Sequence, residues 1–293
     1  MRSINLEGIM SVHFITPSNA LAPYIKRYWA IENTFDKNEK YIQRIVPTGL
    51  TELILYFTES PKILTKNKYR PSKIALYGHQ NDFYDIELTG KLSVFSIVFQ
   101  PQGLMCFFKF PLHEICNQNI PLQCIDRQTG RDFEEKMGVA TTFQERVNIA
   151  EAYFYNLLKN NYTNSEFQRI NHFVELIKKS HGNINSNKMA LSRRQLERIF
   201  SKHIGISPKQ YQKIIRFQFS IFQKQQNKYV GTTELTCESG YFDHTHLIND
   251  FKSLCGLKPK QYFMENEAYS DFFSKKNVHL CRPVGYIHTQ IKP

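Results

Sequence analysis

One sequence pattern occurs twice in this chain, in copies 51 residues apart, and it restricts the fold more than any other feature. Aligned over 192–211 and 243–262, the copies share seven identities in 20 positions, which is typical of duplicated architecture. Each copy has a polar N-cap candidate (Ser192, Asp243), apolar residues four apart and a glycine about one turn later. The pattern predicts two short helices with one inward face each. The shared residues are Leu196, Phe200, Gly205 and 208–211 in the first copy, and Leu247, Phe251, Gly256 and 259–262 in the second.

The positive charge of the chain is concentrated on this repeat. The 293 residues are enough for two domains with separate cores, and they carry a net charge of +12. The segment 166–265 holds 16 Lys/Arg and 8 Asp/Glu, so 8 of the 12 surplus positive charges lie there. Such a field favours a polyanionic partner: nucleic acid, an acidic membrane surface or an acidic protein. Two matching helices on a basic segment favour insertion into a nucleic-acid groove.

The N-terminal region, 11–115, is predicted to be rich in strands. The segments 51–57 and 92–99 are apolar and contain many β-favouring residues, and prolines and glycines separate them from their neighbours. This spacing indicates a small antiparallel barrel or sandwich. One early helix is expected around Ala22–Tyr28.

Helical periodicity begins near residue 131 and continues to about 265. Two helices fit 131–160, with a break near 138–142, and the polar stretch 160–165 is the predicted linker. Further helices are expected over 170–177, from Pro208 to about Gln226, and over 233–238. The predicted fold class is therefore α+β, with a β-rich domain followed by an all-α domain of two helix-turn-helix units joined by a long helix. The tail 267–293 has no predicted structure or role.

The second copy has the residue types that read DNA bases. A short helix, a turn at Gly240 and a cap at Asp243 precede the helix from His244, which follows helix-turn-helix logic. Leu247 and Phe251 should face inward. Thr245, His246 and Asn249 should share the outer face, where their donors and acceptors suit base edges in a major groove.

The first copy supports the same interpretation. Arg194, Glu197 and Arg198 should share an outer face, because arginine pairs bidentately with guanine and glutamate accepts from the cytosine amino group. Two such helices joined by a rigid helix over 208–226 could enter successive major grooves roughly 34 Å apart. The predicted phosphate contacts are Arg193, Lys202, Lys209, Lys252, Lys258 and Lys260.

Together these motifs resemble the AraC/XylS family of bacterial transcription regulators. The resemblance implies a DNA domain over 166–265 with base-reading positions at the six residues above. The N-terminal motifs Ile45–Leu53 and Phe99–Gly103 resemble the β-rich sensor domains of some members. The segment between Gly182 and Ser192 is shorter than in the family, so the helix around Ile184–Ala190 is expected to be one turn short. The residues that carry the resemblance are Ser192, Arg194–Leu196, Arg198, Phe200, Gly205–Pro208, Tyr211, Gly240–Asp243, His246, Phe251, Lys252, Gly256, Pro259 and Tyr262.

The favoured function is a sequence-specific DNA-binding transcription regulator with double-stranded DNA as its partner. We expect 11–115 to sense a small-molecule effector or mediate association, and 131–160 to connect the domains or form a homodimer. An activator would also contact RNA polymerase. No catalysis and no cofactor are implied. The absence of a signal peptide and of an apolar run of ~18 residues predicts a cytoplasmic protein without a membrane partner.

The six cysteines include no Cys-x-x-Cys pair, so free, mostly buried thiols are expected and no metal site. His244 and His246 are two apart on a helix and should point to different sides. His13, His79 and His113 are scattered without a close-spaced ligand set, which favours surface or structural roles. Five aromatic residues could line a ligand pocket, although ordinary core is the simpler interpretation: Tyr24, Tyr28, Trp29, Phe95 and Phe99.

Three alternatives remain open. The repeat could be a helical scaffold that binds no DNA. The chain could be a small-molecule-binding or enzymatic β-barrel protein whose DNA domain is degenerate, since its first unit is short. It could also attach to a membrane surface through its basic tail. Salt-sensitive binding to duplex DNA separates the regulator from the scaffold and from the β-barrel protein with a degenerate DNA domain. Membrane attachment would require liposome binding that survives loss of 166–265.

Overall fold

The computed structural model describes residues 11–37, 40–64, 70–161, 164–182, 192–227 and 229–264. It divides into two compact units, Met1–Ile170 with Glu197–Ser207, and Asn171–Leu196 with Pro208–Pro293. The tail 267–293 and the helix expected around Ile184–Ala190 lie outside the described residues. The predicted α+β fold, with a β-rich N-terminal domain before a helical C-terminal domain, is confirmed.

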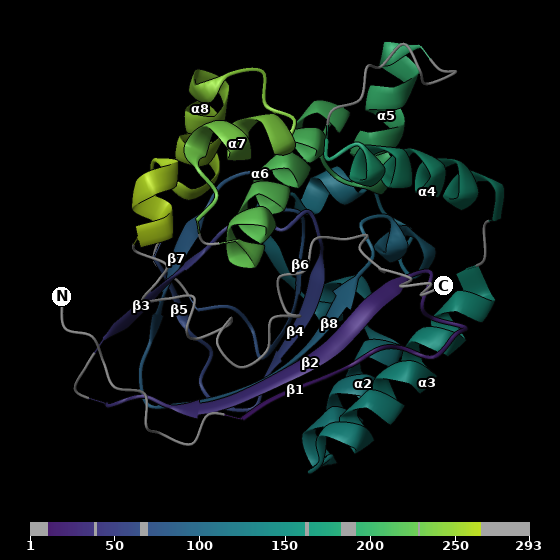
Figure 1. The fold of residues 1–293 in the computed structure, drawn as a ribbon. Helices are drawn as coiled ribbons and strands as arrows, with labels where there is room; N and C mark the ends of the chain where they lie inside the picture. The colour runs from purple at the N-terminus through teal and green to yellow at the C-terminus, as the bar shows by residue number, and fades with distance from the viewer. Residues whose placement is uncertain are drawn as a thin grey trace, which may run out of the picture. The chain divides into compact units, whose positions relative to one another are not determined.

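The β-rich domain contains two antiparallel sheets in its described part (Figure 1). The larger sheet has the strand order β1-β2-β8-β4-β6-β9 and the smaller sheet has the order β3-β7-β5. Short 3-10 helices η1 and η2 and a single-turn helix α1 interrupt the chain around β9. The bounds are β1 Ser11–Ile15, β2 Ile25–Thr34, β3 Tyr41–Ile45, β4 Glu52–Tyr56, β5 Lys62–Leu64, β6 Ile74–Tyr77, β7 Tyr84–Leu88, β8 Lys91–Phe99, η1 Gly103–Cys106, η2 Leu112–Ile115, β9 Asn119–Pro121 and α1 Leu122–Ile125.

The large sheet is buried on both faces along β8, which explains why this strand is apolar almost throughout. One face carries Phe95, Ile97 and Phe99 into the main hydrophobic core. The opposite face carries side chains that pack against the small sheet, where Ala75 and Tyr77 meet Ile63. The sheets thus form the layered, sandwich-like arrangement that the sequence predicts.

The prediction of a helix around Ala22–Tyr28 is wrong. A turn closes there, with the Ile25 amide donating to the Leu21 carbonyl at 2.8 Å, and β2 begins directly at Ile25. β2 pairs with β1 on one side and β8 on the other, so its hydrogen bonds come from segments distant in sequence. These pairings outweigh the local helical pattern, because tertiary context overrides propensity.

Helices α2 (Gln128–Val139) and α3 (Phe143–Asn161) confirm the two helices predicted over 131–160. A capping box starts α3, since the Thr142 amide donates to Glu145 Oε2 at 3.1 Å and the Glu145 amide donates to Thr142 Oγ1 at 3.2 Å. Phe133 and Phe154 pack into the same core as the large sheet. These helices are therefore part of the β-rich unit's core.

The α3 residue Glu151 ties this helix to β2 with polar contacts. Its carboxylate accepts from Tyr28 Oη at 2.9 Å, from the Ser18 amide at 3.0 Å and from the Ser18 hydroxyl. Burial raises the pKa of the Tyr28 phenol, and the neighbouring Glu151 charge raises it further. Tyr28 therefore stays a neutral donor beneath α3.

Helices α6 and α7 match the predicted bounds closely, whereas α4 begins at Asn164, six residues before the predicted 170–177. The predicted linker 160–165 is largely helical, because α3 ends at Asn161 and α4 begins at Asn164. Figure 1 shows α6, α7 and α8 packed side by side. The bounds are α4 Asn164–Lys179, α5 Arg193–His203, α6 Pro208–Gln226, α7 Thr232–Glu238 and α8 His244–Cys255.

The cysteines of the described residues are free, but they are not mostly buried as expected. Cys106 and Cys255 are buried, Cys116 is half-buried, and Cys124 and Cys237 are exposed. Burial raises the pKa of the Cys106 thiol to about 12. Exposed cysteines occur here because Cys124 and Cys237 lie on the outer sides of short helices.

Candidate nucleic-acid interface

Helix α8 begins and ends as the repeat predicts. The Asp243 carboxylate caps its first turn by accepting from the His246 amide at 2.7 Å. Gly256 closes the helix in the left-handed conformation, with φ of 76°. Leu247 and Phe251 are fully buried and Ile248 is half-buried, so the predicted inward face is confirmed. The outer face of α8 is thereby fixed toward solvent.

That outer face presents Thr245 and Asn249, which are both exposed. Lys252 follows one turn later and is also exposed. Thr245 and Asn249 are four residues apart and therefore neighbours on one side of the helix. Their hydroxyl and amide groups can donate to and accept from base edges.

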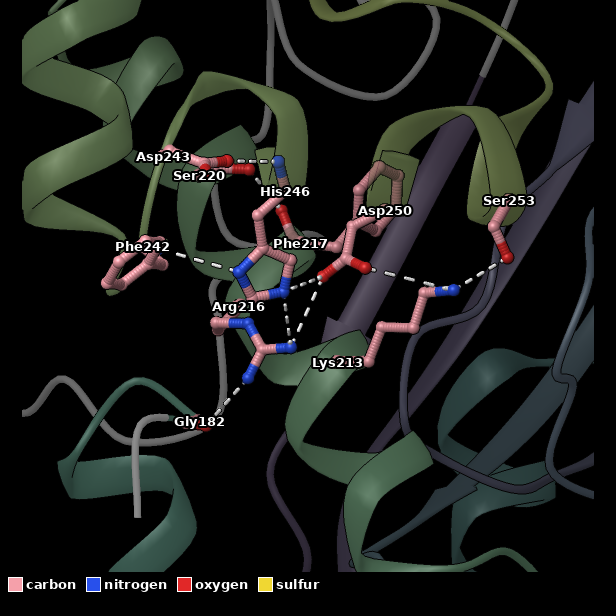
Figure 2. Close-up of polar contacts among 10 residues, drawn as sticks. All are labelled: Gly182, Lys213, Arg216, Phe217, Ser220, Phe242, Asp243, His246, Asp250 and Ser253. Carbon is pink, nitrogen blue, oxygen red and sulfur yellow. Dashed lines mark hydrogen bonds and ion pairs between the residues drawn. The ribbon is translucent and has the colours of Figure 1, made fainter. Parts of the chain in front are cut away.

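The third predicted reader, His246, has a different environment. Figure 2 shows its ring turned toward α6, and its side chain is 37% exposed. Nδ1 accepts from the Phe242 amide at 3.5 Å, while Nε2 lies 3.6 Å from Asp250 Oδ2 and 3.4 Å from Arg216 Nη2. Both ring nitrogens therefore face protein groups, so His246 is poorly placed to read a base.

Helix α5 is capped by the predicted Ser192. The Ser192 amide donates to Gln195 Oε1 at 3.1 Å, and the Gln195 amide donates to Ser192 Oγ at 3.3 Å, which forms a capping box. Leu196 and Phe200 are buried. Gly205 follows with φ of 96°, and its amide donates to the Phe200 carbonyl at 2.9 Å. The predicted glycine C-cap is therefore confirmed in this copy too.

The outer face of α5 carries the three predicted readers of the first unit, Arg194, Glu197 and Arg198, and all three are exposed. The six predicted phosphate contacts are exposed as well: Arg193, Lys202, Lys209, Lys252, Lys258 and Lys260. Exposed cations on long side chains can reach phosphate oxygens without distorting either helix.

The long helix α6 supports α8 through a packed aromatic cluster. The Phe217 and Phe251 rings meet edge to face with centroids 4.8 Å apart, and Tyr262 lies 5.7 Å from Phe251. At ~1.5 Å per residue, the 19 residues of α6 span roughly 28 Å. A rigid element of this length can carry α8 as a fixed part of the domain.

Two features of this interface are not predicted from the sequence. Phe242 is 93% exposed directly before the Asp243 cap, although an apolar residue at this position often packs back on the helix. Arg216 and Asp250 form an ion pair between α6 and α8, with Nη2 and Oδ2 3.3 Å apart. Asp250 stands on the buried face of α8, which the sequence could have marked as a polar residue needing a partner.

The remaining histidines and aromatics have structural surroundings. His13 stacks on Phe143, and buried His79 lies with Nε2 3.4 Å from the Pro101 carbonyl. No group of three or more His, Cys, Asp or Glu in the described ranges is arranged to hold a metal ion. Four of the five aromatics considered for a pocket, Tyr24, Tyr28, Phe95 and Phe99, are core residues, whereas Trp29 is half-buried and points to the other face of the sheet.

Two family models match the chain. Residues 13–121 match a domain of unknown function, DUF6597. Residues 186–265 match a helix-turn-helix domain that is found in AraC-type regulators. The chain carries an AraC-type helix-turn-helix domain. With capped α5 and α8 exposing basic and polar faces, this domain makes the protein a DNA-binding transcription regulator, and no observation favours the alternative of a degenerate domain.

Several solved structures are similar to the chain at low sequence identity. ToxT from Vibrio cholerae O395 is 12% identical, with a TM-score of 0.45 over 81% of this chain and 97% of that one. Fatty-acid-bound ToxT from strain SCE256 is 14% identical, with a TM-score of 0.42 over 90% and 97%. The AraC-like activator CuxR is 8% identical, with a TM-score of 0.21 over 89% and 86%. No curated protein matches the chain.

Among the described residues, no helix combines the length and the apolar character that a membrane crossing requires.

Proposed function

We propose that the protein recognises a specific DNA sequence by inserting α5 and α8 into successive major grooves. The observation that carries the proposal is the outward face of two capped, duplicated helices, with Arg194, Glu197 and Arg198 on one and Thr245 and Asn249 on the other. Each residue has the donors or acceptors that base edges require. Arg193, Lys202, Lys209, Lys252, Lys258 and Lys260 would hold the phosphate backbone on both sides.

Phe242 belongs to the proposed reading surface in place of His246. The Phe242 side chain is exposed at the start of α8, and the Phe242 amide donates to the His246 ring. An exposed phenyl ring three residues before Thr245 can contact the methyl group of thymine, which lies on the major-groove edge. The surface of α8 then combines one apolar and two polar contacts.

The test uses duplexes selected from a random library with the full-length protein. Arg198→Ala and Asn249→Ala should each lower affinity for the selected site by about 1–3 kcal/mol and relax preference at one position. Lys252→Ala should weaken binding to selected and scrambled DNA alike and reduce the salt slope by about one. Equal losses for all three variants on both DNAs would refute base reading by these residues.

We also propose that a polar small-molecule effector binds between the two sheets, on the face of the large sheet that carries Trp29. Trp29, Glu52 and Ser96 form one cluster there. Ser96 Oγ donates to Glu52 Oε2 at 2.9 Å, and the Trp29 side chain also hydrogen-bonds Glu52. Burial raises the pKa of Glu52, while hydrogen bonds from Ser96 and Trp29 and the charges of Arg27 and Lys26 oppose that rise. A buried carboxyl group beside an aromatic ring offers a ligand one polar and one apolar contact.

Trp29 offers a direct readout of this effector site, because it is the chain's single tryptophan. A library of polar metabolites should contain a compound that shifts Trp29 fluorescence and changes affinity for the selected DNA. Glu52→Gln should weaken that compound's binding and leave DNA affinity without it unchanged. Compounds that alter DNA binding but leave the fluorescence unchanged would place the effector elsewhere.

The domain roles complete the proposal. Residues 11–115 would sense the effector. Residues 131–160 would form the interface of a homodimer, and residues 166–265 would bind DNA. In an activator the same chain would contact RNA polymerase from the cytoplasm, and no catalytic step is part of this function. Sedimentation of the full chain with and without selected DNA measures the association state.

A further inference from the structure

The register of the large sheet places two opposite charges on the face that looks toward the small sheet. Val98 lies between the core residues Ile97 and Phe99 of β8, so its side chain points away from the main core. Val98 pairs with Arg27 of β2 on one side and with Glu52 of β4 on the other. Residues directly opposite each other share a face, and two strand spacings separate the Arg27 and Glu52 backbones by roughly 10 Å.

The neighbouring row on this face adds an aromatic ring and a hydroxyl group. Ser96 pairs with Trp29 of β2 and with Ile54 of β4. Ser96 Oγ donates to Glu52 Oε2 at 2.9 Å, and the Trp29 side chain also hydrogen-bonds Glu52. Ser96 is fully buried, whereas Trp29, Glu52 and Ile54 are half-buried. Two neighbours therefore hold the carboxyl group in place, and a molecule between the sheets can still reach it.

The small sheet contributes a buried acceptor to the same layer. Gln43 of β3 pairs with Ile86 of β7, and Ile86 packs against the apolar cluster around Ile63 between the sheets. Gln43 shares this face and is 9% exposed. Its Nε2 donates to the Arg44 carbonyl at 3.0 Å, but its Oε1 has no hydrogen-bond partner among the described residues. The layer therefore contains an acceptor that the described part of the chain leaves unsatisfied.

Both acceptors in this layer call for a ligand that brings hydrogen-bond donors. A buried acceptor without a donor is costly, because folding removes its water and supplies nothing instead. The Glu52 carboxylate can accept about four hydrogen bonds, more than Ser96 and Trp29 provide. A primary ammonium group carries three donors, and its positive charge compensates the carboxylate. An ammonium group thus fits Glu52 and Gln43 together.

The other end of the charged row calls for an anion. Burial raises the pKa of Glu52, and the positive charge of Arg27 is close enough to counteract part of that rise. A guanidinium group binds a carboxylate through two parallel hydrogen bonds. Arg27 would repel a purely cationic ligand, and Glu52 would repel a purely anionic one. A ligand that carries both charges satisfies both residues.

We propose that the effector is a small zwitterion of the amino-acid class, bound between the two sheets. Its ammonium group is held by Glu52 and Gln43, its carboxylate is held by Arg27, and its apolar part lies against Trp29. This inference rests on the proposed effector site and adds the chemical class of its ligand.

The first test uses the unmodified full-length protein. The common L-amino acids are titrated into it, and binding is followed by calorimetry and by the fluorescence of Trp29, the chain's single tryptophan. At least one amino acid should bind. Its amine, which lacks the carboxylate, and its deaminated acid, which lacks the ammonium group, should each bind about tenfold more weakly or worse. This comparison decides the question even where a variant fails to fold.

Variants then assign each charge of the ligand to its partner. Glu52→Gln should weaken binding of the amino acid and the amine by about tenfold, with little effect on the deaminated acid. Arg27→Gln should weaken binding of the amino acid and the acid more than that of the amine. Glu87→Gln is the matched control, because Glu87 alternates with the inward Ile86 and pairs with Lys40 at 3.2 Å on the other face. It should keep all three affinities.

Gln43→Met tests the unpaired acceptor. Methionine keeps the length of the side chain but removes the Oε1 acceptor, so affinity for the amino acid should fall by about threefold to tenfold. The ligand-free variant should unfold at nearly the same urea concentration as the unmodified protein. A purely structural role for Gln43 would give the opposite pattern, with lower stability and unchanged affinity.

Failure of every amino acid to bind would overturn the proposal, as would amine and acid analogues that bind as tightly as the amino acid. If another compound of the metabolite library then shifts Trp29 fluorescence, the effector site stands with a ligand of another class. If no compound shifts it, the proposed effector site fails as well. Binding to the selected DNA is measured without ligand, so DNA recognition is judged separately.

Discussion

His79 shows how one buried side chain couples the β-rich unit to pH. It is 1% exposed, and its Nε2 lies 3.4 Å from the Pro101 carbonyl. Burial lowers the pKa of His79 to about 4, and the Pro101 carbonyl opposes this shift only partly. The folded protein therefore keeps this ring neutral at a pH where an unfolded chain would protonate it.

The consequence is a loss of stability in acid. Between pH ~6.5 and pH ~4 the unfolded chain binds more protons at this site than the folded chain, so folding weakens as pH falls, by up to about 1.4 kcal/mol per pH unit. Relative to His79→Gln, the free energy of unfolding should drop by roughly 3 kcal/mol across this range. Urea unfolding followed by Trp29 fluorescence measures the difference, and a difference independent of pH would contradict it.

The proposed contact between Phe242 and a thymine methyl group can be tested by changing the DNA. Replacing one thymine of the selected site by deoxyuridine removes only the methyl group, and at the contacted position this should lower affinity by about 1 kcal/mol. The same replacement should have no effect on Phe242→Ala. A double-mutant cycle with equilibrium binding gives the coupling, and coupling near zero at every thymine would exclude the contact.

The elements of the C-terminal half follow from local signals. Pro208 starts α6, and Asp243 and Gly256 bound α8, because caps and special backbone conformations act within a few residues. The strand β2 could not be predicted in the same way, since its partners β1 and β8 supply the hydrogen bonds from a distance. The exposed cysteines Cys124 and Cys237 likewise depend on which side of a helix remains uncovered.

The residues of the candidate site could likewise be predicted from the sequence only in part. Thr245 and Asn249 could be placed on the outer face of α8 from their spacing alone. His246 shares that spacing, but Arg216 comes from another helix and Asp250 from the next turn, so periodicity could not show that its ring faces protein. Tertiary hydrogen bonds, unlike helical faces, leave no repeat in the sequence.

The junction of α4 and α6 gives a prediction at the scale of elements. Gly182→Ala should destabilise the protein by about 2–4 kcal/mol, because alanine at positive φ is strained and its Cβ would collide with the Gln212 carbonyl. Gly138→Ala is the matched control: its Cβ meets nothing within 4 Å, and the exposed helical position should gain about 0.5–1 kcal/mol. Far-UV circular dichroism during urea unfolding measures both, and equal stability of the two variants would be inconsistent with this packing.

At the scale of the whole molecule, charge should govern how DNA binding responds to salt. The chain carries a net +12, and 8 of those charges lie in 166–265. If six phosphates are contacted, the logarithm of the binding constant should fall with the logarithm of salt concentration at a slope of about −5. Titrations from low to moderate salt measure this slope, and a slope near zero would rule out a phosphate-based interface.

Two duplicated, capped helices should give the protein a preference for one DNA sequence. Its most direct measurement is the affinity of the full-length protein for the selected duplex and for a scrambled duplex of equal length, at one fixed salt concentration. We expect the selected duplex to bind about 10³-fold more tightly or better. Equal affinities for the two duplexes would contradict it.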